Sequence, residues 1–239
     1  MLQRSTWNGL GDGADRSDVE EDLSVPRGTV TRSTYHTTSE LLEAGLEELG
    51  LRARAGQVEA LTGLSELVER WGRSTNLSGH RSAEAVARHL VLPAAGLFSR
   101  LPAVGTVADL GSGAGFPALP VAILWPDRCV TSVEARERRH HFQRAAVREL
   151  GLENVHLQRG RAESIPASPH ELVVAQAVGP PGQVVEWMLR WVAPGGLLVI
   201  PGGEVAPELA ARPGLAPGPV LRYREPLGGP SRTAWIARR

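Results

Sequence analysis

A glycine-rich loop preceded by an acidic residue is the feature of this sequence best suited to chemistry. Asp109 lies at the end of an apolar run, and Gly111, Gly113 and Gly115 follow it. Glycine lets a ligand approach bare backbone, and the helix after such a loop offers N–H groups without partners. We therefore expect a ligand to bind here, at the carboxyl edge of a parallel sheet.

The glycine spacing argues against two common nucleotide-binding loops. A dinucleotide loop needs its third glycine three positions after the second, where this chain has Phe116. A phosphate loop of the Walker type needs a Gly-Lys pair, and the sequence contains no lysine. The carboxylate of Asp109 would also repel a pyrophosphate. NAD and ATP are thus disfavoured, and Asp109 suits a ligand with an ammonium or another positive centre.

A second acidic residue, Glu134, ends the next apolar run, residues 129–134. It stands at the offset where an acidic side chain accepts hydrogen bonds from ribose hydroxyls in nucleoside-binding sheets. The alternative is an ordinary acid at a helix N-terminus, where the helix dipole favours it. Together with the loop, the two acids favour S-adenosylmethionine as the ligand over a generic α/β domain.

Alternating strand-like and helical stretches are expected to position these residues. Strands are predicted at 106–110, 129–134, 155–158, 172–177 and 197–200, with helices around 117–125, 136–150 and 181–192. This alternation predicts an α/β fold with a parallel sheet covered on both faces. Two further β-like segments, 220–224 and 233–237, flank a Gly-Gly-Pro turn and predict a C-terminal antiparallel hairpin.

Upstream of the loop, apolar residues recur at helical spacing in three stretches. Thr37 and Glu40 have the spacing of a capping box, and the third stretch ends before Pro102. Residues 37–101 are expected to form a helical cap, and residues 102–239 the ligand-binding domain. Residues 1–36 mix Gly, Asp, Ser and Arg without a period, so we expect a disordered leader.

Composition restricts the partners and the location. The 26 basic residues, all arginine, balance 26 acidic residues, so net charge gives no global argument for nucleic acid. The N-terminus carries no apolar stretch of a secretory signal, and no apolar run is long enough to span a membrane, so a cytoplasmic protein is expected. Any RNA contact must therefore use a local patch. One candidate patch is a basic run that contains Arg136, Arg138, Arg139, His140, His141, Arg144 and Arg148. The alternative is that this run is a solvated helix face.

The residues around the loop resemble the signature of a known family. The run from Asp109 to Pro117 reads Asp-Leu-Gly-Ser-Gly-Ala-Gly-Phe-Pro, and Pro120 and Ile123 follow. It is similar to the glucose-inhibited division protein B family, the guanine-N7 methyltransferases of small-subunit (16S) ribosomal RNA. The similarity covers about residues 39–203 and continues in Trp71, Asn76-Leu77, His89, Glu134, Arg138-Arg139, Phe142, Leu150-Gly151-Leu152, Asn154-Val155 and Arg161-Ala162-Glu163.

The resemblance implies a Rossmann-like class I methyltransferase sheet and S-adenosylmethionine as the cofactor. It places the backbone of residues 111–115 on the methionine part, Glu134 on the ribose, and Ala162-Glu163 beside the adenine. The full set of expected cofactor-binding residues is Asp109, Gly111, Ser112, Gly113, Gly115, Phe116, Glu134, Ala162 and Glu163.

Methylation of guanine N7 needs no general base, because this atom already carries an in-plane lone pair. No residue is therefore assigned a catalytic role, and no metal is expected; positioning supplies most of the barrier reduction. The expected partner is ribosomal RNA or the small subunit, bound by a monomer. Substrate contacts are expected from Arg138, Arg139, Arg161 and Gln176, since arginine captures phosphate well.

Four departures from the family pattern lie on the expected substrate or inter-domain side. Gly72 replaces an Asn, Leu92-Pro93 replaces Asp-Ser, Ala175-Gln176-Ala177 replaces Ser-Arg-Ala, and Pro201-Gly202 replaces Lys-Gly. Two alternatives therefore stay open beside the ribosomal reading. One is a small-molecule methyltransferase that kept the cofactor site, and the other is a catalytically silent cofactor-binding protein.

Overall fold

The computed structural model describes residues 35–209 and 211–239, so the predicted leader lies outside the described residues except for Tyr35 and His36. The first helices are α1 (Thr38–Glu48) and α2 (Ala55–Gly72). The predicted capping box of α1 is confirmed: the backbone N–H of Glu40 donates to Thr37 Oγ1 at 3.1 Å, and the Glu40 carboxylate accepts from the Thr37 N–H at 3.3 Å.

The third predicted helix is divided into three parts. It consists of α3 (Ala83–Val86), a π-helical turn (Ala87–Val91) and α4 (Leu92–Phe98). Apolar spacing alone could not show the π-helical turn, because the added residue shifts the helical phase only locally.

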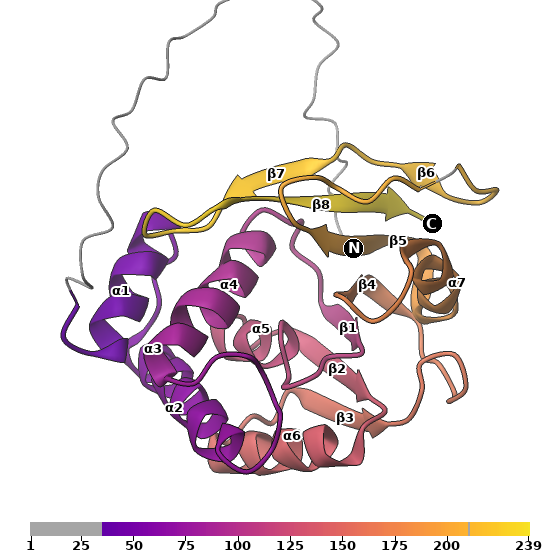
Figure 1. Ribbon diagram of the computed structural model, residues 1–239. Helices are drawn as coiled ribbons and strands as arrows, with labels where there is room; N and C mark the ends of the chain where they lie inside the picture. The colour runs from indigo at the N-terminus through magenta and orange to yellow at the C-terminus, as the bar shows by residue number, and fades with distance from the viewer. Residues whose placement is uncertain (1–34, 210) are drawn as a thin grey trace, which may run out of the picture. The chain divides into compact units, whose positions relative to one another are not determined.

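Eight strands form one sheet in the order β3-β2-β1-β4-β5-β8-β6, with β7 paired to β8 (Figure 1). The pairs among β1 to β5 are parallel, and β8 runs antiparallel to β5. The predicted parallel sheet and terminal hairpin are confirmed, whereas the short β6 was not predicted. The strands are β1 (Thr106–Leu110), β2 (Cys129–Glu134), β3 (Val155–Arg159), β4 (His170–Ala175), β5 (Val192–Gly202), β6 (Ala216–Pro217), β7 (Leu221–Arg224) and β8 (Ser231–Arg238).

Helices cover both faces of the sheet, as expected. On one face, α5 (Ala118–Leu124) and α6 (Glu137–Glu149) pack on the sheet, and α2 packs on both of them. On the other face, α7 (Pro181–Trp191) buries Met188 and Trp191 against β4 and β5. Each fully buried large apolar side chain stabilises the fold by about 1.5–3 kcal/mol. No helix among the described residues is long and apolar enough to cross a membrane.

The strand order fixes where a ligand can bind. β1 and β4 are neighbours, yet the helices that follow them, α5 and α7, pack on opposite faces of the sheet. The loops after these two strands therefore diverge and leave a crevice at the carboxyl edge. Strand β4 ends at Ala175, two residues earlier than predicted, and Ala177 has a left-handed φ of 53°. The chain thus turns away from the sheet beside this crevice.

Candidate functional site

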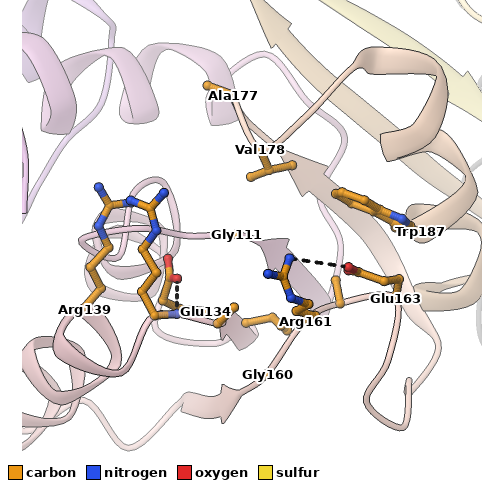
Figure 2. Close-up of a pocket in the computed structure, with 13 residues that line it drawn as sticks. Gly111, Glu134, Arg139, Gly160, Arg161, Glu163, Ala177, Val178 and Trp187 are labelled. Atoms are coloured by element: carbon orange, nitrogen blue, oxygen red, sulfur yellow. Dashed lines mark hydrogen bonds and ion pairs between the residues drawn. The ribbon is translucent and has the colours of Figure 1, made fainter.

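A hollow lies at the carboxyl edge of the sheet, over the ends of β1 to β4. Figure 2 shows Glu134 and Arg139 on one side of it and Trp187 and Glu163 on the other. We call it the first hollow. Its lining comprises Gly111, Val133, Glu134, Ala135, Arg136, Arg139, Gly160, Arg161, Ala162, Glu163, Ala177, Val178 and Trp187.

The loop after β1 requires its glycines. Gly111, Gly113 and Gly115 have φ values of 73°, 61° and 83°, in the left-handed region where a side chain is strained. A Cβ at Gly111 would overlap the Val178 side chain, and one at Gly115 would lie 2.6 Å from a Leu119 methyl carbon. A Cβ at Gly113 would meet only Arg139 Nη1, at 3.6 Å, so this glycine faces open space.

Most N–H groups of the loop are bonded within the protein. The first N–H groups of the following helix, which were expected to lack partners, are bonded too: Ala118 donates to Asp109 and Leu119 to the Gly115 carbonyl. The Gly111 and Ser112 N–H groups donate to the Val133 carbonyl at 2.8 and 3.1 Å, and the Gly115 N–H donates to the Ser112 carbonyl at 2.8 Å. The reason is that the loop folds back on the end of β2 and on itself. Such a loop cannot cradle a phosphate, and with the Glu134 carboxylate against it the site favours a cation.

Glu134 is held in place by backbone donors at the edge of the first hollow. Its Oε2 accepts from the Gly113 N–H at 2.9 Å, and its Oε1 accepts from the Arg136 N–H at 2.6 Å. The side chain is buried, yet a carboxylate has about four lone-pair sites, of which these bonds use two. Glu134 can therefore accept two further hydrogen bonds from a diol in the hollow. The alternative interpretation of Glu134, an acid at a helix N-terminus, is thus correct in part, because Arg136 is the N-cap residue of α6.

Asp109 does not line the first hollow, although we expected it to meet the ligand directly. It is buried, and its Oδ2 accepts from the Ala118 N–H at 3.1 Å, which fixes the start of α5. Its Oδ1 has no hydrogen-bond partner among the described residues. Burial raises the pKa of Asp109 well above its usual value; the Ala118 N–H opposes this shift, and the negative charge of Glu134 adds to it.

The Ser112 hydroxyl also turns away from the first hollow. It accepts from the Ser132 hydroxyl at 2.6 Å and from Gln143 Nε2 at 2.8 Å, and all three residues are buried. Gln143 Nε2 donates in addition to the Gly113 carbonyl at 2.8 Å. This network ties the loop to β2 and α6, so Ser112 positions the loop through its side chain.

The far wall of the first hollow is a turn after β3 that α7 holds from behind. Trp191 Nε1 donates to the Ala162 carbonyl at 3.0 Å, and Arg190 donates to the Ala162, Glu163 and Ile165 carbonyls. Among the described residues, the N–H groups of Ala162 and Glu163 have no acceptor in the protein. This wall therefore presents free backbone donors, which suit the ring nitrogens of a purine base.

The predicted substrate residues are not all gathered at the first hollow. Arg139 and Arg161 line it, and Arg161 lies 3.9 Å from Glu163. Arg138 is exposed on α6 and does not line it. Gln176 lies instead at a third hollow, between the cap helices and the loops after β1 and β4. Phe116, which was expected to bind the cofactor, also lines this third hollow and not the first. This hollow is lined by His89, Leu90, Pro93, Ala94, Leu97, Phe116, Pro117, Gln176, Pro201 and Tyr223.

A second hollow connects these two sites. Gln176 and Pro201 line it together with Ala177 and Val178, which also line the first hollow. Arg232 of β8 is the one charged residue in this lining, which lies wholly within the described residues. Its Nε donates to Glu225 Oε1 at 2.6 Å, and Glu225 is only 3% exposed, so the guanidinium is anchored.

Several lining residues were missed by reasoning from the sequence. Val178 and Trp187 belong to the loop after β4 and to α7, and no motif marks either of them. Trp187 lies at a half-buried position of a strongly amphipathic helix, which was the only signal available. Arg232 sits about thirty residues beyond the last predicted motif and reaches the site only through the pairing of β8 with β5.

Comparison with known proteins places these features in context. The family described as "rRNA small subunit methyltransferase G" matches residues 57–213. A relative of that name from Halorhodospira halophila is 36% identical over 173 residues, 72% of this chain and 82% of the relative. One from Neisseria meningitidis serogroup A is 30% identical over 171 residues, 70% of this chain and 83% of the relative.

A solved structure agrees with the fold. A putative O-methyltransferase from Klebsiella pneumoniae aligns with a TM-score of 0.53 at 22% identity, over 75% of this chain and 89% of that one. At this identity the likeness concerns the sheet and its helices, and it confirms the expected Rossmann-like fold.

Proposed function

Because this chain belongs to the rRNA small subunit methyltransferase G family, we propose that it methylates N7 of a guanine in small-subunit ribosomal RNA. It is an S-adenosylmethionine-dependent enzyme, as its family is. The observation that carries the proposal is the position of Glu134. Its carboxylate, fixed by two backbone N–H groups, faces a hollow whose opposite wall offers free backbone donors.

The residues of the first hollow fit a cationic nucleoside. Glu134 would bind the ribose hydroxyls, and the Ala162 and Glu163 backbone would bind the adenine. The Gly111 and Gly113 carbonyl oxygens and the open space beside Gly113 would take the methionine end. Asp109, with its unpartnered buried Oδ1, holds a carboxyl behind this loop, and an ammonium or sulfonium group bound there would stabilise its ionised form. In this arrangement Asp109 and Ser112 act through the loop rather than by touching the cofactor.

The reaction needs positioning more than proton transfer. The bound cofactor supplies an electrophilic methyl group. The chain's part is to present guanine N7 in line with that methyl and to exclude water, since N7 attacks with a lone pair that needs no deprotonation. The second hollow adjoins the cofactor site through Ala177 and Val178, and the third adjoins the second through Gln176 and Pro201; these two hollows are the places for the acceptor base. Gln176 lies between them and would contact the base or its phosphate.

The remaining expectations complete the proposal. Residues 37–101 would act as a cap that forms one wall of the acceptor site, with residues 102–239 as the cofactor domain. The protein would act as a monomer in the cytoplasm on ribosomal RNA or the small subunit. Arg139 and Arg161, at the mouth of the first hollow, would contact phosphates.

A small-molecule methyltransferase is the second candidate. The observation that favours it is the second hollow, where Gln176 and Pro201 stand in place of the family's arginine and lysine. These two neutral residues suit an uncharged acceptor better than a polyanion. The anchored Arg232 in the same lining argues against it, because it retains a cation there.

The test is transfer of tritiated methyl groups from S-adenosylmethionine to small subunits and naked RNA from a strain that lacks the modification. Digestion and chromatography then identify the methylated nucleoside, and Glu134→Ala, assayed at subsaturating S-adenosylmethionine, serves as the control with weakened cofactor binding. We expect 7-methylguanosine with the wild-type protein and much less of it with the variant. Cofactor binding without incorporation into either substrate would favour the small-molecule or silent alternative.

A further inference from the structure

The exposed face of α6 carries a concentration of positive charge that extends beyond the cofactor site. Residues 136–148 hold five arginines and one glutamate, a net charge of +4 with histidines neutral. Since the whole chain has a net charge of zero, the remainder carries −4. The positive charge of this protein is therefore local. We define the α6 basic face as Arg136, Arg138, His141, Arg144 and Arg148, all of which are exposed.

The charges of this face are not neutralised within the protein. Among the described residues, Arg138, Arg144 and Arg148 form no ion pair. The one acid in the run, Glu137, is taken by Arg159 of β3 at 2.9 Å, with His141 Nε2 at 3.8 Å. These positive charges also act on His140, a buried residue of the same helix. Burial lowers the pKa of His140, and the charges of Arg144, His141 and Arg159 lower it further.

The face is rigid because the opposite side of α6 is firmly packed. Phe142, Gln143 and Ala146 are buried, and the Phe142 ring meets Trp71 edge to face with centroids 5.7 Å apart. Between the charges lies a shallow hollow lined by His141, Arg144, Ala145 and Arg148. Arginines on such a backbone lose less conformational entropy when they bind a row of anions than arginines on a free loop.

The basic face is continuous with the first hollow. Arg136 belongs to both, and Arg139, on the next turn of the helix, also lines the hollow. From Arg136 to Arg148 the helix advances about 18 Å at about 1.5 Å per residue. This length matches several successive phosphates of a stacked strand, which lie about 3.4 Å apart along the axis.

We infer that the α6 basic face is the docking surface for the RNA backbone beyond the target nucleotide, with Arg144 and Arg148 contacting phosphates remote from the methylated base. This inference rests on the proposed function, and it adds the path that the substrate follows across the protein. An acidic protein surface would need matching carboxylates at fixed positions, whereas a phosphate backbone presents a continuous row of charge to a helical row of planar donors.

The test separates docking from cofactor binding. Arg144→Gln/Arg148→Gln is compared with the wild type and with Arg52→Gln/Arg54→Gln, which removes two exposed arginines between α1 and α2. Binding of naked small-subunit ribosomal RNA is measured over a salt series, and adenosylhomocysteine binding by calorimetry. Neither Arg144 nor Arg148 lines the first hollow. They lie about 7.5 and 13 Å of helix from Arg139, and charges are screened over a Debye length of about 8 Å, so cofactor affinity should stay nearly unchanged.

We expect the α6 variant to bind RNA about tenfold more weakly and to lose about 1.4–1.8 from the slope of log K against log salt, the contribution of two phosphates. Each single variant should lose half of that slope, and the control pair should keep the wild-type slope. For methyl transfer, KM should rise while kcat stays constant.

Three results would overturn the inference. A slope like that of the wild type or the control pair would show that these arginines touch no phosphate. Weaker binding to whole subunits with unchanged binding to naked RNA would assign the face to a ribosomal protein. If the wild type itself neither methylates nor binds ribosomal RNA, the proposed function fails together with the inference, whereas wild-type methylation with an unchanged slope removes the inference alone.

Discussion

The first hollow and the second hollow lie side by side at one edge of the sheet but are built differently. In the first, loop N–H groups bond to the end of β2, and the Glu134 carboxylate accepts from the Gly113 and Arg136 N–H groups. In the second, the lining combines small apolar residues with Gln176 and with a single cation, Arg232, that comes from the last strand. The cofactor side thus depends on bonded backbone, whereas the charge of the acceptor side comes from one side chain near the end of the chain.

This difference in construction indicates which side of the site tolerates amino-acid substitutions. The loop at residues 111–115 has three glycines in the left-handed region and N–H groups bonded within the protein, so a substitution there would strain the backbone or break a hydrogen bond. The acceptor side has fewer such ties: Gln176 is exposed, and Pro201 lies at a half-buried position of β5. Accordingly, three of the four departures from the family pattern, at Pro93, Gln176 and Pro201, line the second or third hollow, while the cofactor loop matches. The following predictions test this contrast.

The largest effect is expected for Gly113→Val. The backbone there has a φ of 61°, which costs a branched residue roughly 1–2 kcal/mol, and the side chain would enter the hollow beside Arg139. Cofactor affinity should fall at least about a hundredfold, a loss of about 3 kcal/mol. Calorimetry with adenosylhomocysteine measures it.

Gly151→Val is the matched control for that experiment. Gly151 has nearly the same φ, 64°, and a Cβ there would meet nothing within 4 Å. It should therefore lose a similar amount of unfolding free energy but bind the cofactor normally. Normal binding by Gly113→Val as well would mean that the loop does not contact the ligand.

Glu134→Ala should weaken cofactor binding by about 1–3 kcal/mol, or about 5–150-fold, through lost charge-assisted hydrogen bonds to the ribose. The variant also leaves the Gly113 N–H without its acceptor. Calorimetry measures the affinity, and thermal unfolding without cofactor separates the two effects. Glu137→Ala, three residues further on and exposed, should bind like the wild type. Equal affinity in Glu134→Ala and wild type would remove this carboxylate from the site.

Asp109→Asn should change how stability depends on pH. The pKa of Asp109 is raised above 3.8 in the folded protein, so folding favours the protonated carboxyl. Its contribution to the free energy of unfolding is fully present below pH 3.8 and is lost as pH rises through the raised pKa. The stability of the wild type relative to the variant should therefore decrease with pH, by at most about 1.4 kcal/mol per pH unit. Urea unfolding from pH 4 to 8 without cofactor measures this. Parallel profiles for the two proteins would show that Asp109 does not titrate abnormally.

Features of the fold and site differ in whether the sequence alone can predict them. Strand ends, the loop and Glu134 could be predicted because period-two runs and glycine spacing are local signals. The sequence could not show that Val133, Asp109 and Glu134 would use up the N–H groups of the loop and the start of α5, since those bonds depend on register between strands. Arg232 was invisible for the same reason: only the antiparallel pairing of β8 with β5 brings it beside Pro201.

The smallest effect is expected on the acceptor side. Gln176→Arg restores the arginine of the family pattern at an exposed position, and a new guanidinium there should strengthen contact with a phosphate or base. Exposed charge pairs are worth up to about 1 kcal/mol, so the rate of methyl transfer to small subunits should rise by at most about fivefold. The assay is tritiated methyl incorporation at subsaturating subunit concentration, with cofactor affinity as the internal check.

Arg232 limits how much Gln176→Arg can raise the rate. It already places an anchored guanidinium in the second hollow, so the new arginine would bind the same substrate phosphate as Arg232. Arg232→Gln in the wild-type background should then slow transfer, and Gln176→Arg in that background should recover more than it adds to the wild type, because only one cation would remain to bind the anion. Equal gains in both backgrounds would mean that the two side chains contact different groups. No gain in either would leave the acceptor side to an uncharged substrate, as the small-molecule alternative requires.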